Sequence, residues 1–163
     1  RKYSMNTVQA SIVEWFKTCK PEPKEKDITT QIGVHLEEVE EMLTVLHSLS
    51  TNSYGNLVIG NAKVAMSTLA YYLKEGVSVI ELDKLTPELE EELLDSILDQ
   101  AVTGIGVATL MGQDYINGLV EVNRANYSKF DDTGKPVFLA NGKIGKSANY
   151  VKPNLKPFLG ESK

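Results

Sequence analysis

Four glutamates lie within five consecutive positions of the segment HLEEVEEMLTVLHSL, and these are Glu37, Glu38, Glu40 and Glu41. The apolar spacing around them predicts a helix over about residues 28–50. On a helical wheel Glu38 lies inside the apolar arc and Glu41 at its edge, whereas Glu37 and Glu40 fall on the opposite face and are expected to be solvated. A buried carboxylate is costly unless a partner compensates its charge. Glu38 and Glu41 therefore need a cation.

A second acidic stripe follows in the helix expected from Thr86 to about Met111. Glu92, Asp95 and Asp99 recur at the spacing i, i+3, i+7, which places them on one side of the helix, opposite a wide apolar face. Carboxylate oxygens without thiols or an obligatory histidine suit Mg²⁺ or Mn²⁺. A solvated acidic patch, or ion pairs with the C-terminal lysines, would explain the same residues.

The elements that must position these side chains predict an all-α fold, an antiparallel bundle of four or five helices. The expected helices span about residues 6–19, 28–50, 56–75, 86–111 and 115–128. From Phe130 onward, turn chemistry at Asp-Thr-Gly and Asn-Gly flanks a short apolar run, which predicts a small β-hairpin. We therefore expect a helical domain over residues 5–128. An irregular C-terminal arm over residues 129–163 is expected to pack on it or on a neighbouring subunit.

Charge is distributed unevenly along the chain, whose net charge is −5. Residues 1–122 hold 9 Lys or Arg and 19 Asp or Glu, whereas residues 123–163 hold 8 basic and 3 acidic residues. The acidic balance argues against nucleic acid as the main partner. An acidic body with a basic tail could bind a metal in one part and an anion with the other, and the tail could equally dock on the body by charge.

The remaining composition is typical of a cytoplasmic protein. The one cysteine, Cys19, provides no disulfide framework and is interpreted as a small structural residue in a reducing compartment. No apolar run approaches the ~20 residues of a membrane span, so we expect no membrane partner. Met5 is the expected natural start, and Arg1–Ser4 before it are left out of the interpretation.

The run Glu37-Glu38-Val39-Glu40-Glu41 matches the EExxE motif of the all-α nucleoside triphosphate pyrophosphohydrolases, the MazG-like group. That group includes dimeric dUTPases, dCTP pyrophosphatases and phosphoribosyl-ATP pyrophosphohydrolase. The run ELLD, Glu92 to Asp95, matches its second motif, ExxD. The tail EVNRANYSKFDDTGKPVFLANGKIGKSANYVKPNL is similar to that of MazG-like members from phage and bacterial genomes. The resemblance covers about residues 8–157.

This resemblance implies a helical bundle that assembles into homodimers or homotetramers. It implies Mg²⁺-dependent cleavage of a nucleoside triphosphate between the α- and β-phosphates, which releases the monophosphate and pyrophosphate and cleans the nucleotide pool. Glu38 and Glu41 would bind the metal, with Glu37 as a helper. Either Glu38 or Glu41 would orient or deprotonate the attacking water. The second pair is Glu92 and Asp95 or, as we favour, Asp95 and Asp99.

The same resemblance suggests residues for the substrate. The candidates for phosphate, sugar or base are Asn123, Arg124, Asn126, Lys129, Lys143, Lys146 and Trp15. For each lysine the alternative is simple solvation, and for Trp15 it is a place in the core. A different class of function also fits the acidic stripes. In this alternative the chain is a non-catalytic helical oligomerisation or regulatory protein, in which basic arms neutralise the stripes.

Overall fold

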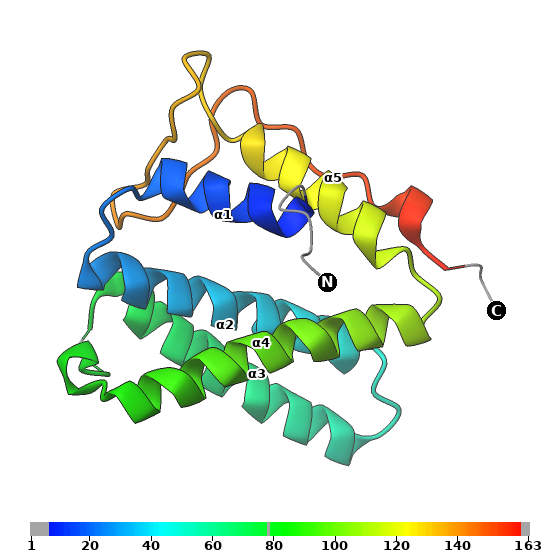
Figure 1. The fold of residues 1–163 in the computed structure, drawn as a ribbon. Helices are drawn as coiled ribbons and strands as arrows, with labels where there is room; N and C mark the ends of the chain where they lie inside the picture. Colours follow the sequence, from blue (N-terminus) through cyan, green and yellow to red (C-terminus); the bar gives the residue numbers. More distant parts are fainter. Residues whose placement is uncertain (1–6, 78, 161–163) are drawn as a thin grey trace. The chain divides into compact units, whose positions relative to one another are not determined.

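A computed structural model describes residues 7–77 and 79–160, and these contain five α-helices and no β-strand (Figure 1). The helices are α1 (Val8–Cys19), α2 (Glu25–Ser48), α3 (Ser53–Glu75), α4 (Pro87–Leu110) and α5 (Tyr115–Tyr127). Short 3₁₀ turns occupy Leu82–Lys84 and Lys156–Phe158. The all-α prediction is confirmed. Met5, at the start of the expected helical domain, lies outside the described residues.

Local capping chemistry fixes most helix ends where the sequence predicts them. The Thr86 hydroxyl accepts from the backbone N–H of Leu89, and Pro87 opens α4. Gly76 ends α3 in the left-handed region at φ 78°. Helix α2 begins at Glu25, before the predicted start at about residue 28. Lys24 is the N-cap, and the Asp27 carboxylate accepts from the Lys24 N–H inside the first turn.

The described chain divides into two compact units. The α2–α3 unit comprises Glu22–Leu82 together with the short segment Phe138–Lys143. The α5 unit comprises the described residues up to Pro21, then Asp83–Val137, and the described residues from Ile144 onward. The first predicted motif, with Glu37, Glu38 and Glu41, therefore belongs to the α2–α3 unit. The second, with the acidic residues of α4, belongs to the α5 unit.

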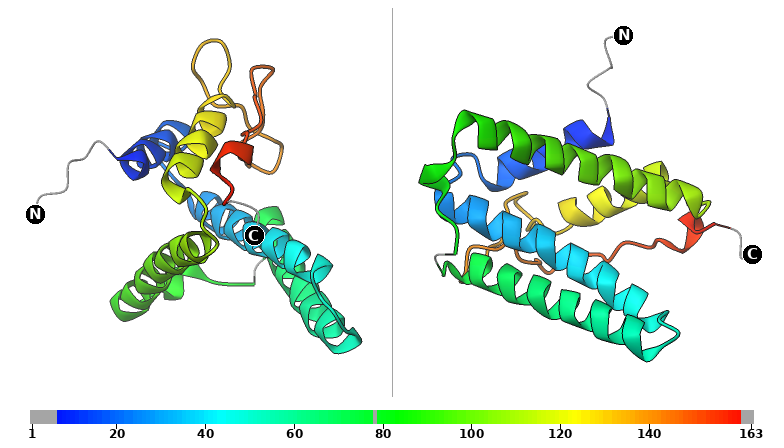
Figure 2. Two further views of the ribbon diagram at one scale, coloured as in Figure 1. Left: turned by 90° about the vertical axis from the view of Figure 1, so that its right-hand side faces the viewer. Right: turned by 90° about the horizontal axis from the view of Figure 1, so that it is seen from below.

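In the α2–α3 unit the two helices run antiparallel and are joined by residues 49–52 (Figures 1 and 2). Gly33 marks their closest approach, because a Cβ at this position would meet the carbonyl oxygen of Ala70 and the Cγ of Lys74, both at 2.8 Å. Ala70 and Leu73 are buried. The missing side chain lets the α3 backbone lie directly against α2. The side of α2 that carries Gly33 therefore faces α3.

Much of the apolar surface of these two helices is not covered by their own unit. At the end of α2, Val45 and the C-cap residue Leu49 are 62% and 69% exposed. On α3, Leu57 and Val64 have the spacing of an apolar core face, yet they are 60% and 66% exposed. The reason is geometric. Two helices that pack on each other share one seam, so only part of each apolar face can be buried.

The core of the α5 unit forms where α1 packs on α5. Trp15 is 4% exposed and lies parallel to the ring of Phe130, with ring centroids 6.0 Å apart. Its indole N–H donates to the carbonyl oxygen of Asn126 at 3.0 Å. The Asn123 amide donates to the Ser11 hydroxyl at 2.9 Å. Aromatic packing and these polar contacts together fix α1 on α5.

Helix α4 contributes no buried residue, although most of it is apolar. Only Ile105, Gly106 and Ala108 near its C-terminal end are half-buried. By length and composition alone, α4 is the one helix in the described part of the chain that could cross a membrane, and a single such helix carries little weight. Its apolar face is therefore largely exposed.

Candidate functional site

Glu37 lies between two lysines in the α2–α3 unit. Its Oε1 accepts from Lys74 Nζ at 2.8 Å, and its Oε2 accepts from Lys143 Nζ at 2.8 Å. The Lys74 side chain is only 16% exposed and that of Glu37 is 31% exposed. The prediction of a solvated Glu37 was wrong, because its face of α2 is the one that packs on α3, one turn beyond Gly33.

Glu40 is the second glutamate on this covered face. Its carboxylate lies 3.8 Å from Lys63 Nζ, and the two side chains are 23% and 25% exposed. The hydroxyl of Thr44 donates to Glu40 Oε1 at 2.9 Å. Glu40 is thus held by groups of its own unit, and the expectation that it is solvated was also wrong.

Glu38 and Glu41, in contrast, are exposed. The sequence places them at or near the core, on the arc that also carries Val45 and Leu49. In the structure this arc is uncovered within the unit, so both carboxylates are accessible to solvent. The two residues are three positions apart and lie on neighbouring parts of the helix surface.

The Glu37 carboxyl has a pKa below its ordinary value. Burial alone would raise this pKa, but the hydrogen bonds from Lys143 and Lys74 and the charges of both lysines outweigh burial and lower it. Glu37 is therefore ionised at neutral pH, and both of its oxygens accept a charge-assisted hydrogen bond.

The segment that carries Lys143 is a tight turn. The N–H of Leu139 donates to the carbonyl oxygen of Lys143 at 2.8 Å, and the N–H of Gly142 donates to that of Leu139 at 2.9 Å. Gly142 has a φ of 82°, which glycine adopts without strain. The Asn141 amide donates to Glu75 Oε1 at 3.2 Å. The turn is therefore held on the unit at Glu75 as well as at Glu37.

Beside this turn the unit has an open cavity of about 760 Å³, lined by Lys26, Glu75 and residues 139–142. The Lys26 ammonium donates to the carbonyl oxygens of Leu73 and Lys74, which are the two residues before the last residue of α3. A cation at a helix C-terminus is favoured by the helix dipole. Lys26 therefore has a structural role that links the start of α2 to the end of α3.

The acidic residues of α4, which are Glu92, Asp95 and Asp99, are all exposed. They share one side of the helix, as the spacing predicts. Within the described residues, no group of three or more His, Cys, Asp or Glu side chains is close enough to hold a metal ion. Exposed carboxylates on α2 and on α4 are suitable in chemical type for Mg²⁺, and their role as ligands stays a prediction.

Two predicted substrate residues on α5 have structural partners. Asn123 is 7% exposed, and its amide nitrogen donates to the Ser11 hydroxyl. Its buried Oδ1 accepts no hydrogen bond from the described part of the chain. Asn126 is half-buried, and its backbone carbonyl accepts from Trp15. Both residues lie against α1, so contacts with a nucleotide remain predictions for their side chains.

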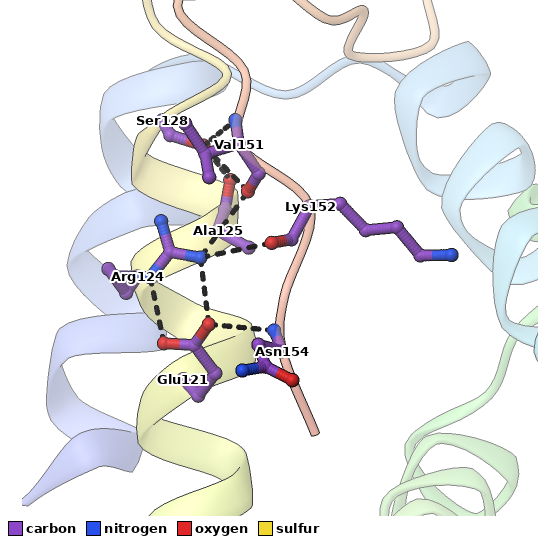
Figure 3. Close-up of polar contacts among 7 residues, drawn as sticks. All are labelled: Glu121, Arg124, Ala125, Ser128, Val151, Lys152 and Asn154. Carbon is purple, nitrogen blue, oxygen red and sulfur yellow. Dashed lines mark hydrogen bonds and ion pairs between the residues drawn. The ribbon is translucent and has the colours of Figure 1, made fainter. Parts of the chain in front are cut away.

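Arg124 holds the C-terminal tail on α5 (Figure 3). Its Nε and Nη2 donate to the two Glu121 oxygens at 2.8 and 2.9 Å, and Nη2 also reaches the carbonyl oxygens of Val151 and Lys152 at 3.4 and 3.3 Å. The N–H of Asn154 donates to Glu121 at 2.9 Å. A phosphate contact by this guanidinium stays a prediction, and a phosphate would have to compete with these acceptors.

The remaining predicted substrate residues lie around aromatic rings. Lys129 Nζ lies 5.6 Å from the Trp15 ring centroid, and Lys146 Nζ lies 4.6 Å from that of Tyr150. Trp15 is buried, so its environment is that of a core residue, and stacking on a base would require the ring to be uncovered. Lys146 is exposed. The phosphate roles of both lysines stay predictions.

Cys19 is buried beside this cluster. Burial raises the pKa of its thiol to about 11, although the charges of Lys129 and Lys20 oppose the rise. A thiol with this pKa is protonated at neutral pH and is a poor nucleophile. This agrees with its interpretation as a structural residue.

Sequence reasoning missed the roles of Lys74, Glu75 and Lys26. One signal was available for Lys74. Antiparallel pairing of two helices about a short connection places the last turns of α3 beside the first half of α2, where Gly33 and Glu37 share a face. A lysine in the last turn of α3 is then the natural partner of Glu37. No pattern in the sequence reveals the contact between Asn141 and Glu75.

No protein-family model matches the chain, and no curated protein and no solved structure matches it. Any assignment of function must therefore come from the acidic motifs, the basic arm and their geometry.

Proposed function

We propose that the protein is a Mg²⁺-dependent nucleoside triphosphate pyrophosphohydrolase that converts a (d)NTP and water to the monophosphate and pyrophosphate. The proposal rests on the two acidic motifs, and one observation carries it further. A lysine of the C-terminal arm, Lys143, lies 2.8 Å from a carboxylate of the first motif. An enzyme of this kind needs carboxylates for a metal and an ammonium for phosphate at one place, and the α2–α3 unit has both.

In this proposal Glu38 and Glu41 bind Mg²⁺, and Asp95 and Asp99 on α4 are the second ligand pair, with Glu92 as the alternative to Asp99. Bound Mg²⁺ would neutralise charge on the triphosphate. Glu38 or Glu41 orients or deprotonates the water that attacks phosphorus. Lys143 and Lys146 bind phosphate oxygens, and Arg124 and Lys129 are further candidates.

The finer architecture belongs to the same proposal. We place the five helices in the bundle type of the all-α pyrophosphohydrolases, with a small β-hairpin in the C-terminal arm around the apolar run 137–139. The uncovered apolar faces of α2, α3 and α4 support assembly into a homodimer or homotetramer, since surfaces of this size are rarely left open on a monomer. A cytoplasmic location, without nucleic acid or membrane as a partner, fits a nucleotide substrate.

The test is pyrophosphate release from a panel of common dNTPs and NTPs, with Mg²⁺ or with EDTA. We expect release by the wild type with Mg²⁺ only, and a loss of about 10²-fold or more in Glu41→Gln. Glu40→Gln is the matched control, because it removes a carboxylate one position away that is paired with Lys63. Equal release with EDTA, or equal loss in both variants, would contradict the proposal.

A second candidate is favoured by the same ion pair. Glu37 is neutralised by Lys74 and Lys143, which is how a non-catalytic helical oligomerisation or regulatory protein would pair its acidic stripes with basic arms. Such a protein would release no pyrophosphate from any nucleotide. Its thermal stability would also not change on addition of Mg²⁺, because its folded state would have no site for the ion.

A further inference from the structure

The hydrogen bond between Glu37 and Lys143 joins residues that are 106 positions apart. Glu37 and Glu41 are four residues apart on α2 and therefore lie on one side of the helix, about one turn or 5–6 Å apart. The Lys143 ammonium is thus held about one helical turn from a carboxylate of the proposed metal site. A nucleotide whose phosphates bind Mg²⁺ at Glu38 and Glu41 would meet this ammonium.

We propose that Glu37 is a positioning residue rather than a metal ligand. Its carboxylate holds Lys143, and with it the turn 138–143, on the α2–α3 unit, so that the ammonium is in place for phosphate before the nucleotide arrives. This inference rests on the proposed function, and it names the role of one residue in that site.

The hydrogen bonds of Glu37 favour positioning over metal binding. Each of its two oxygens already accepts from an ammonium, Oε1 from Lys74 and Oε2 from Lys143. A metal ion bound here would have to displace two cations. An ammonium has three N–H donors, and Glu37 uses one of those on Lys143. The lysine can therefore stay on Glu37 and still donate to a phosphate oxygen.

The turn itself is built to keep Lys143 in this place. It is closed by its own backbone hydrogen bonds and is anchored a second time by Asn141 on Glu75. Lys74 is largely buried and its stem packs on Gly33, so the Glu37 carboxylate is fixed from the helix side as well. A fixed carboxylate and a closed turn reduce the entropy lost when Lys143 binds phosphate.

The first test needs no nucleotide. We expect faster hydrogen–deuterium exchange in peptides that cover residues 138–143 for Glu37→Gln and for Asn141→Ala. Lys152→Gln is the matched control, because it removes a charge from an exposed arm lysine outside these contacts, and its exchange should equal that of the wild type. Asn141→Ala keeps the test valid if Glu37→Gln unfolds, since it leaves every carboxylate of α2 unchanged.

The second test separates positioning from metal binding. We expect Glu37→Gln to raise KM by about tenfold, the loss of roughly one charge-assisted hydrogen bond, with a smaller change in kcat. The Mg²⁺ concentration for half-maximal activity should stay the same. The double variant Glu37→Gln/Lys143→Gln should be no worse than Lys143→Gln alone. Glu37→Asp should restore part of the loss.

The opposite pattern would overturn the inference. In that pattern Glu37→Gln leaves the hydrogen–deuterium exchange of residues 138–143 unchanged and raises the Mg²⁺ concentration needed for activity. Its effect on activity would also add to that of Lys143→Gln in the double variant.

If neither the wild type nor any variant releases pyrophosphate, the proposed function fails, and tripolyphosphate then replaces the nucleotide as the probe. Protection of residues 138–143 by tripolyphosphate in the wild type, lost in Glu37→Gln, would support positioning. Equal exchange in both, with and without tripolyphosphate, would refute it.

Discussion

At the scale of single residues, the pairing of Arg124 with Glu121 decides what else the guanidinium can bind. The two groups form a bidentate ion pair on α5, and the backbone of the tail adds further donors and acceptors. The Arg124 hydrogen bond and the Asn154 N–H lower the pKa of the Glu121 carboxyl from 4.5 to about 2. The pair therefore persists well into the acid range.

A pH-dependent stability follows from this carboxyl. Its pKa is lower in the folded state, so its stabilising contribution is complete above about 4.5 and disappears as the pH falls towards 2. We expect Glu121→Gln to have a lower Tm than the wild type at pH 7, and the difference should shrink between pH 4.5 and 2. Thermal unfolding of both proteins across this range is the measurement.

The control for this prediction is Glu14→Gln, which removes an exposed carboxylate that lies 3.4 Å from Lys17 on the same helix. Exposed pairs of this kind contribute little to stability. The control should therefore show no comparable change with pH. A Tm difference for Glu121→Gln that stays constant from pH 7 to 2 would show that Glu121 acts by packing rather than by its charge.

At the scale of elements, the contact between α2 and α3 depends on Gly33. An alanine Cβ would meet the Ala70 carbonyl oxygen and the Lys74 Cγ at 2.8 Å, and the first of these is backbone that cannot turn away. We expect Gly33→Ala to lower the free energy of unfolding by about 1–3 kcal/mol. It should also speed exchange at residues 138–143, because a shifted Lys74 loosens Glu37. Chemical denaturation checks the first effect.

Gly60→Ala is the matched control on α3, where the nearest atom to a new Cβ is His47 Nε2 at 4.0 Å. Here the alanine should stabilise the helix by up to about 1 kcal/mol, because glycine is the poorer helix former. If Gly33→Ala were as stable as Gly60→Ala, the close packing of α2 on α3 at this point would be contradicted.

The elements themselves could be predicted from sequence far better than their faces. The capping residues Thr86, Gly76 and Asp114 interact with backbone groups only a few positions away. The helix ends at these residues could therefore be predicted from the sequence alone. The face that α2 presents to α3 depends on a partner helix. An amphipathic wheel assigns the most apolar arc to the core, and it overlooked Gly33, whose packing value comes from having no side chain.

The candidate site shows the same limit. The acidic motifs were visible as residue types at fixed spacing, and the exposure of Glu38 and Glu41 leaves them accessible. The second partner of Glu37 was not predictable, since Lys143 is 106 positions away and reaches α2 through a turn whose place in the fold no local pattern encodes. The alternative of ion pairs with C-terminal lysines did anticipate a contact of this kind.

At the scale of the whole molecule, many large apolar side chains of the described helices are exposed, and a contiguous exposed apolar surface is typical of an interaction site. Helix α4 has no buried residue, and Leu93, Leu94 and Leu98 on its apolar face are 41%, 56% and 56% exposed. Its wide apolar face lies opposite the acidic stripe of Asp95 and Asp99. The helix therefore has one side suited to contact with another apolar surface and one side that stays in contact with water.

We predict that the protein is an oligomer in solution and that α4 contributes to the contact. Leu98→Glu places a charge on the apolar face, and its burial in an interface would be costly. We expect it to weaken self-association by about tenfold or more. Sedimentation velocity over a range of protein concentrations measures the change in the monomer fraction.

Ser96→Glu is the matched control, because it adds the same charge to the same helix on the side of the acidic stripe. It should leave the sedimentation behaviour unchanged. A wild type that remains monomeric at all concentrations would refute oligomerisation. A dimer that both variants retain would indicate that the exposed apolar residues of α2 and α3, rather than those of α4, form the contact.

Comparing pyrophosphate release by Leu98→Glu with that of the wild type would then show whether the assembly is needed for activity. A folded monomer that has lost activity would mean that one chain does not complete the site by itself.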